Sequence, residues 1–168
     1  MLTRRAAGLA LVALAGLSQV AADCSGGRTE DVLGYVEVGG RPAVYAPLCD
    51  DDTVRGVRVY TAPPPGEDGD FVPLWEAEAP IADATRHGLI VLGDDAGFRA
   101  VRRAAPARFP RWLSVAVDTE RGRIVDEARE RPTAPPSYPA GTPAAAMSFE
   151  TIHGQMSYAE LRSTTTCR

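Results

Sequence analysis

Short stretches in which apolar and polar residues alternate, separated by turn residues, constrain the fold of this chain more than any other feature. Within Val54–Tyr60, the valines at 57 and 59 fall on one face of an extended strand and Arg58 on the other. Similar stretches occur at Leu33–Val38, Ala43–Leu48, Phe71–Ala77, Gly88–Leu92, Trp112–Val117, Arg123–Asp126 and Met147–Ile152. Strands that recur at intervals of roughly ten residues are typical of antiparallel β folds.

Turn residues and the scarcity of helical patterns narrow the fold class. Gly39-Gly40 between two apolar stretches is typical of a hairpin turn. No strand is followed by a long amphipathic helix, which argues against a parallel α/β sheet. We therefore predict an all-β chain in which residues 32–168 form a single antiparallel β-sandwich, immunoglobulin- or fibronectin-like.

Helices are expected at only two places. Ser157 and Glu160 have the spacing of a capping box and predict a short helix. Ala100–Ala107 predicts a second helical turn that Pro106 ends. The proline-rich segments Thr61–Asp70 and Arg131–Pro143 are expected to be surface loops, because their prolines do not fit a central strand.

The first residues have the three parts of a secretory signal. Arg4 and Arg5 precede the apolar stretch Ala6–Leu17, and small residues follow up to Ala21-Ala22. The apolar stretch is too short to span a bilayer as a helix. We predict a signal peptide at residues 1–23, a flexible tether at 24–31, and export of the domain that follows.

Three cysteines bear on how the exported protein is held. Cys24 begins a Cys-Ser-Gly-Gly segment like the start of a bacterial lipoprotein, although Asp23 departs from the small residue normally found there. If Cys24 is acylated, Cys49 and Cys167 remain as a pair, and we predict a disulfide between them. Lipidated and freely secreted forms both remain open.

The charged residues exclude several kinds of chemistry. All 18 basic residues are arginines, and neither lysine nor asparagine occurs in the chain. This rules out a Schiff-base lysine, a P-loop lysine and an N-glycosylation sequon. The net charge of −4 argues against nucleic-acid binding.

Two acidic segments are candidate metal sites. Asp50–Asp52 and Glu67–Asp70 could offer clustered oxygens to calcium, but an EF-hand loop needs a glutamate at its twelfth position. Counting from Asp50 and from Asp68, that position holds Thr61 and Ala79. We therefore expect acidic turns, with no metal and no other cofactor.

Catalytic candidates are few. His87 and His153 are the only histidines, and no Gly-x-Ser-x-Gly, His-Glu-x-x-His or Cys-x-x-Cys motif accompanies them. Trp75 and Trp112 could line a carbohydrate site, but the apolar strands around them favour packing in the core. We predict no catalytic residues.

The chain resembles small exported proteins and lipoproteins of high-GC Gram-positive bacteria. The similarity lies in the segment from Cys24 to Gly27, in PLCDDDTVRGVRVY from Pro47, and in PLWEAEAP from Pro73. It implies a location and a β-rich domain without an activity. The sequence thus favours a non-enzymatic binding or structural module of the cell envelope, with an envelope protein or cell-wall ligand as partner and with a lipid anchor as its sole membrane contact. An exported hydrolase is the alternative.

Overall fold

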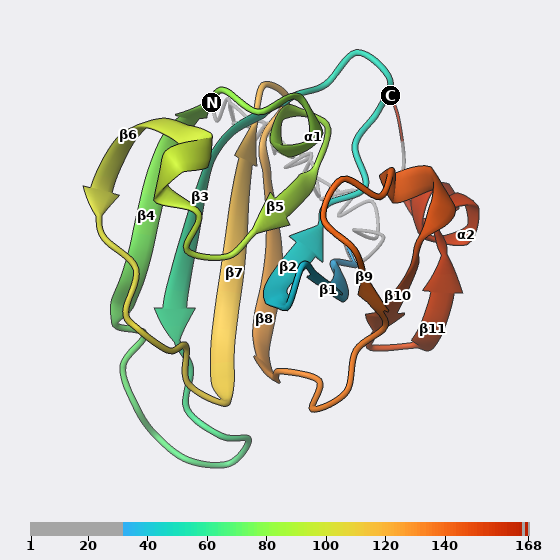
Figure 1. Cartoon of the computed structure of the whole chain (residues 1–168). Helices are drawn as coiled ribbons and strands as arrows, with labels where there is room; N and C mark the ends of the chain where they lie inside the picture. Colours follow the sequence, from blue (N-terminus) through green and yellow to red (C-terminus); the bar gives the residue numbers. More distant parts are fainter. Residues whose placement is uncertain (1–31, 166, 168) are drawn as a thin grey trace, which may run out of the picture.

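The computed structural model describes residues 32–165 and 167, so the predicted signal peptide, the tether and Cys24 lie outside the described residues. The described chain is mostly β and forms two sheets, A and B, that face each other (Figure 1). Its strands are β1 (Gly34–Val38), β2 (Arg41–Tyr45), β3 (Val54–Thr61), β4 (Pro73–Pro80), β5 (Leu89–Val91), β6 (Phe98–Arg103), β7 (Trp112–Thr119), β8 (Arg123–Glu130), β9 (Ser137–Tyr138), β10 (Ser148–Thr151) and β11 (Gly154–Ser157). Its helices are α1 (Asp83–Arg86) and α2 (Tyr158–Ser163), with 3-10 turns at Asp95–Gly97 and Ala144–Ala146.

Sheet B is antiparallel, with the strand order β6-β4-β3-β7-β8. Buried and more exposed side chains alternate along β3 from Val57 to Tyr60, as the sequence predicted. Val57 and Val59 are fully buried, as is Val115 on the neighbouring strand β7. Its outer face is charged: the Arg58 guanidinium lies 3.2 Å from Glu76 and 2.8 Å from Asp118 on neighbouring strands. Such cross-strand pairs suit a solvated face.

Sheet A has the order β11-β10-β1-β2-β5, and the short strand β9 runs parallel to β1. The β1–β2 hairpin turns at Gly39-Gly40 as predicted, with positive φ of 58° and 73° that glycine adopts without strain. Successive residues of β1 point to opposite faces, so Tyr35 and Val36 belong to two different apolar clusters.

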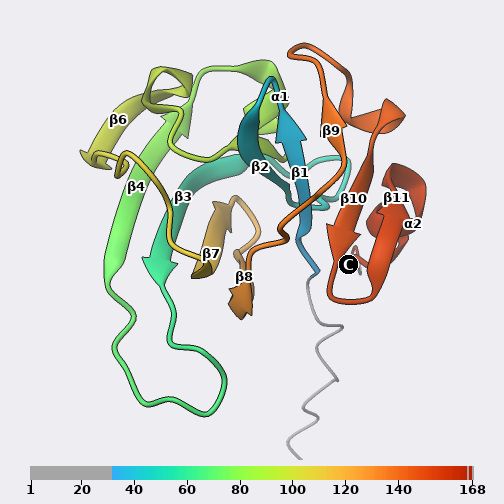
Figure 2. The ribbon, with the colours of Figure 1, turned by 60° about the horizontal axis from the view of Figure 1, so that its bottom comes forward.

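The main core lies between the sheets. It joins Val44 and Ile90 of sheet A to Trp75 and Leu113 of sheet B, all fully buried. Figure 2 shows the two sheets on opposite sides of the molecule. The arrangement is consistent with the predicted β-sandwich.

A second cluster covers the other face of sheet A. Phe149 of β10 stacks on Tyr45 with ring centroids 5.0 Å apart, and Leu161 of α2 is fully buried in the same cluster. The predicted capping box is confirmed: the Ser157 side chain accepts from the Glu160 N–H, and the Glu160 carboxylate accepts from the Ser157 N–H. The cap fixes the start of α2 at Tyr158, and Leu161 of the same helix packs into this cluster.

The predicted disulfide is confirmed. Cys49, in the connection between β2 and β3, is bonded to Cys167, with their Cα atoms 5.6 Å apart. This separation lies within the ordinary range for disulfides. The bond ties the end of the chain to the early part of the fold.

Two expectations about local structure were wrong. Ala100–Ala107 was expected to be helical, but residues 98–103 form strand β6, because Ala100 and Val101 pair with the open edge of β4. Arg131–Pro143 is not entirely a loop, since β9 within it pairs with β1 through Val38↔Tyr138. Thr61–Asp70 is a surface loop beyond its first residue, as predicted, and extends away from the sheets in Figure 1.

Candidate functional site

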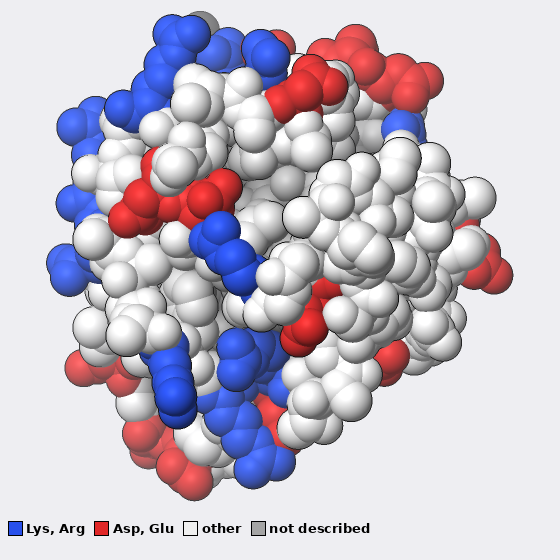
Figure 3. All heavy atoms as spheres, in the orientation of Figure 1, with Lys and Arg blue, Asp and Glu red and all other residues white. Residues whose placement is uncertain are grey.

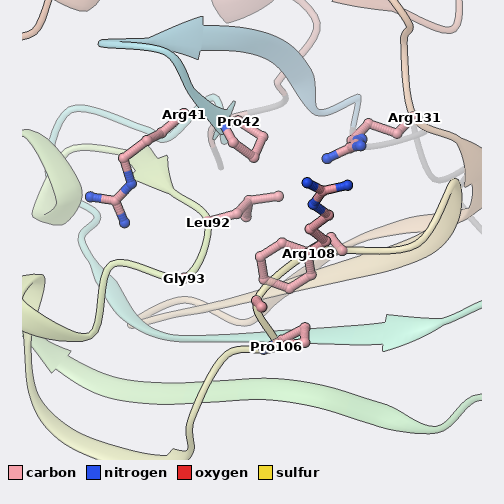
Figure 4. A pocket seen from close by; sticks show the side chains of 9 residues that line it. Arg41, Pro42, Leu92, Gly93, Pro106, Arg108 and Arg131 are labelled. Carbon is pink, nitrogen blue, oxygen red and sulfur yellow. The ribbon is translucent and has the colours of Figure 1, made fainter.

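A cavity of about 350 Å3 lies where connections of both sheets meet. Sheet A contributes the start of β2 and the residues after β5, while sheet B contributes the β6–β7 connection and the residue after β8. The lining residues are Arg41, Pro42, Leu92, Gly93, Pro106, Ala107, Arg108, Phe109 and Arg131 (Figure 4). The size suits a small molecule or one group of a larger ligand.

Apolar side chains form part of the cavity wall. Leu92 and Phe109 belong to the main core and are only 3% and 9% exposed. Gly93 lets the chain pass close to them, because a Cβ at this position would lie 3.0 Å from the Ala105 Cβ and 3.3 Å from the Phe109 ring. The positive φ of 74° at Gly93 also favours glycine. The apolar wall is therefore fixed by the core.

Three arginines supply the charge of the cavity. Arg41 is neutralised in part by Asp94, whose carboxylate lies 3.2 Å away. Arg108 and Arg131 form no ion pair with any residue in the described part of the chain, and their guanidinium groups point toward one another in Figure 4. Basic side chains gather over the lower ends of β7 and β8 in Figure 3. The cavity thus presents two guanidinium groups without a counterion from the described residues.

A buried polar cluster lies at the end of β8 that leads to Arg131. The Tyr35 hydroxyl of sheet A donates a 2.6 Å hydrogen bond to Asp126 of sheet B. The Arg129 guanidinium lies over the Tyr35 ring, 4.4 Å from its centroid, with its Nε 3.8 Å from the Asp126 carboxylate. Its Nη1 is buried with no hydrogen-bond partner among the described residues. These three side chains join the two sheets through charge and hydrogen bonding.

An irregularity in β8 brings the two charged members of this cluster together. β7 advances two residues from Leu113 to Val115, while their partners on β8 advance three, from Arg129 to Asp126. The extra residue is a β-bulge, and it places Asp126 and Arg129 opposite two side chains that both face the core. In a regular strand, residues three apart would point to opposite faces.

The cavity and the cluster are coupled electrostatically. Burial raises the pKa of Tyr35 well above its ordinary value, and the negative charge of Asp126 raises it further. The positive charges of Arg129 and Arg131 act in the opposite direction on the same pKa. Tyr35 is therefore protonated at neutral pH and serves as a hydrogen-bond donor. Arg131 belongs to the cavity and is also close enough to act on the cluster.

The aromatic and histidine candidates lie elsewhere and are not brought together into a site. Trp75 is fully buried and donates a 2.8 Å hydrogen bond from Nε1 to Asp95, which agrees with the packing role favoured by the sequence. Trp112 is half-buried at the start of β7. His87 is exposed at the end of α1, where Nδ1 lies 2.9 Å from the Asp83 carbonyl oxygen. His153 is exposed in the β10–β11 turn.

The side chains of the acidic turn at Asp50–Asp52 make hydrogen bonds and ion pairs with other parts of the fold. Asp52 Oδ1 accepts from the N–H groups of Thr53 and Glu120, at 2.9 and 3.0 Å. Asp50 pairs with Arg162 of α2 at 2.7 Å, and Asp51 pairs with Arg121. The described residues include no group of three or more histidine, cysteine or acidic side chains that could hold a metal ion. None of the helices in the described ranges is long and apolar enough to cross a membrane.

The arginines of the cavity were missed by the sequence analysis. Arg41 is the first residue of β2, whereas Arg108 and Arg131 lie in two separate connections, and no spacing relates the three. The one local signal is Arg108 itself, a lone charge in the segment Pro106–Pro110. No protein-family model, no curated protein and no solved structure matches this chain.

Proposed function

We propose that this protein is an exported, non-enzymatic binding module of the cell envelope, and that its ligand enters the cavity between the two sheets. The observation that carries the proposal is the composition of the cavity lining: charged donors and an apolar wall, without a nucleophile or a base. Small-molecule sites in proteins combine an apolar wall with a few polar groups in this way.

Binding fits this lining better than catalysis. Arginine remains protonated throughout the physiological pH range and does not act as a general base. The other lining residues are proline, leucine, glycine, alanine and phenylalanine, whose side chains have no reactive group. The alternative of an exported hydrolase has no specific observation in its favour among the described residues.

Export is supported by the disulfide between Cys49 and Cys167, since such bonds persist in oxidising compartments. The resemblance to small exported proteins of high-GC Gram-positive bacteria supports the same location. Two facing sheets, antiparallel except for the short strand β9, support the finer proposal of an immunoglobulin- or fibronectin-like sandwich.

The binding function can be tested with protein exported by a bacterial host from the full-length gene. The purified protein is immobilised and exposed to solubilised envelope and cell-wall fractions, and retained material is identified by mass spectrometry. We expect the wild type to retain a component that Arg108→Ala/Arg131→Ala does not retain. The control, Arg55→Ala/Arg102→Ala, removes two arginines that are exposed and paired with Glu120 and Glu78. Equal retention by the wild type and the cavity variant would contradict the proposal.

We further propose that Cys24 is diacylated and anchors the domain at the outer face of the cytoplasmic membrane. The pairing of Cys49 with Cys167 supports this, because it leaves Cys24 as the third cysteine of an exported chain. Two acyl chains give stable attachment, so the protein should partition with membranes. Intact-mass analysis after detergent extraction is the test. A soluble protein that begins at Asp23 and carries no added lipid mass would exclude the anchor.

A further inference from the structure

We propose that the cavity binds a phosphomonoester group carried by a compact apolar body, with Arg108 and Arg131 holding the phosphoryl oxygens. This inference rests on the proposed binding function and names the chemistry of its ligand. The argument has three parts: the charge of the site, the number of donors and the apolar wall.

The charge of the site favours a doubly charged anion. Arg108 and Arg131 point toward one another and have no carboxylate partner among the described residues, so no ion pair within that part of the chain offsets their mutual repulsion (Figure 4). An anion between them removes this repulsion and gains attraction from both sides. A phosphomonoester carries a charge of about −1.5 to −2 at pH 7, which nearly balances two guanidinium groups.

The donors favour a phosphoryl group over a carboxylate. One guanidinium can pair with both oxygens of a carboxylate through two parallel N–H···O bonds, which leaves one acceptor site on each oxygen and a single negative charge for the second guanidinium. A phosphomonoester has three terminal oxygens and can accept bidentate pairs from two arginines at once. Arg41 already forms an ion pair with Asp94, 3.2 Å away, and is therefore not included in the proposed pair of ligand-binding arginines.

The apolar wall of the cavity is the reason for proposing an apolar group on the ligand. Leu92 and Phe109 are buried core residues whose edges reach the cavity, beside Pro42 and Pro106. If inorganic phosphate bound alone, the apolar wall would remain exposed to water, whereas a ring or short alkyl group attached to the phosphate would cover it. A volume of about 350 Å3 has room for both parts.

The test uses calorimetric titration of the exported protein with phenyl phosphate, inorganic phosphate, benzoate and phenol. We expect phenyl phosphate to bind most tightly, inorganic phosphate and benzoate more weakly, and phenol weakest. Arg108→Ala and Arg131→Ala should each weaken phenyl phosphate binding by roughly tenfold or more, since each removes charged hydrogen bonds. Arg108→Lys should restore part of the affinity, because it keeps the charge and loses the planar fork.

Two controls keep this test decisive. Arg102→Ala removes an exposed arginine of β6 and should leave the affinity unchanged. Thermal unfolding of each variant establishes that it is folded, as expected for the exposed Arg108. Phenyl phosphate binding that is equal in the wild type and both alanine variants, or no tighter than phenol binding, would overturn the proposal.

Vesicle experiments distinguish a soluble ligand from a lipid headgroup. Phosphatidic acid carries a phosphomonoester, and phosphatidylglycerol carries a singly charged diester. Arginine-dependent sedimentation with phosphatidic acid vesicles, exceeding that with phosphatidylglycerol vesicles, would assign the site to a lipid. Binding of phenyl phosphate without such sedimentation would assign it to a soluble phosphomonoester.

The envelope retention experiment separates this inference from the function on which it rests. If phenyl phosphate fails to bind while the arginine pair is still needed to retain an envelope component, the binding function stands and the phosphomonoester assignment is wrong. If neither depends on Arg108 and Arg131, both proposals fail.

Discussion

The Tyr35 hydroxyl and the Asp126 carboxylate meet across the interior, 2.6 Å apart, and each comes from a different sheet. Both residues are buried, with exposed fractions of 2% and 7%. A buried carboxylate is costly unless charge and hydrogen bonds compensate for its lost hydration. The Tyr35 hydroxyl and Arg129 supply part of that compensation, so this contact links the two sheets in addition to their apolar core.

Tyr35→Phe should therefore destabilise the protein by about 1–3 kcal/mol, because the variant keeps the ring and removes a donor to a buried carboxylate. Urea unfolding followed by tryptophan fluorescence measures the change. Tyr60→Phe is the matched control, since Tyr60 is a partly exposed residue of β3 and its partner Arg58 keeps the ion pairs with Glu76 and Asp118. A Tyr35→Phe variant as stable as this control would show that the contact adds nothing to stability.

The raised pKa of Tyr35 predicts a loss of stability in alkali. In the unfolded chain the phenol ionises near pH 10, whereas burial and Asp126 keep it protonated in the folded protein to higher pH. The contribution of Tyr35 is thus fully present below about pH 10 and is lost as the pH rises toward the folded pKa. Burial also raises the pKa of Tyr45, so Tyr35→Phe should reduce the alkaline slope without abolishing it. Urea midpoints between pH 8 and about 11 test this, and identical slopes would contradict it.

At the scale of elements, the strands that could be predicted from the sequence are those whose own residues have an apolar pattern, whether one face is buried or both. β3 and β7 are long enough for their alternation to be read, and Val57 and Val117 are paired at the centre of sheet B. β9 is only two residues long and forms because β10 pairs with β1 at Tyr35 and leaves Glu37 and Val38 to β9, which no local pattern reveals. β6 was predicted as helix because the segment Ala100–Ala107 is rich in alanine, whereas pairing with β4 decides the conformation of residues 98–103.

The candidate site escaped prediction for a related reason. Its arginines lie at the start of β2 and on two connections, and the mutual positions of these segments depend on how sheet A and sheet B face each other. The Asp126–Arg129 contact depends on a bulge, and one extra residue in a strand reverses which side chains face inward. The strands of the two sheets could therefore be predicted from the sequence more fully than the contacts between residues of different sheets that form the candidate site.

Packing between elements predicts a large effect at Gly34. A Cβ at this position of β1 would lie 2.5 Å from both Leu161 Cδ2 and Phe149 Cβ. Gly34→Ala should therefore push α2 and β10 away from β1, at a cost of about 1–3 kcal/mol. Gly69→Ala is the matched control, because Gly69 lies in a surface loop and its nearest neighbour is Pro63 Cβ at 3.2 Å. Equal urea midpoints for the two variants would show that β1 tolerates the methyl group.

At the scale of the whole molecule, the last part of the described chain depends on contacts with the β2–β3 connection. Leu161 is buried in the second cluster, Arg162 pairs with Asp50, and the Thr165 hydroxyl donates to the Pro47 carbonyl at 3.0 Å. The disulfide from Cys49 to Cys167 adds a covalent tie across 118 residues. The main core between the sheets involves none of these contacts.

Removing the disulfide should consequently weaken the whole protein and loosen its C-terminal part first. In the chain-entropy model, a closed loop spanning 118 residues stabilises the folded state by about 5 kcal/mol. Cys49→Ser/Cys167→Ser should therefore have a lower urea midpoint and a larger m value, because its unfolded chain is less compact. Amide hydrogen exchange should rise in α2 at urea concentrations where β3 and β7 remain protected. Exchange that rises equally in α2 and sheet B would contradict this order and would mean that the two clusters unfold as one unit.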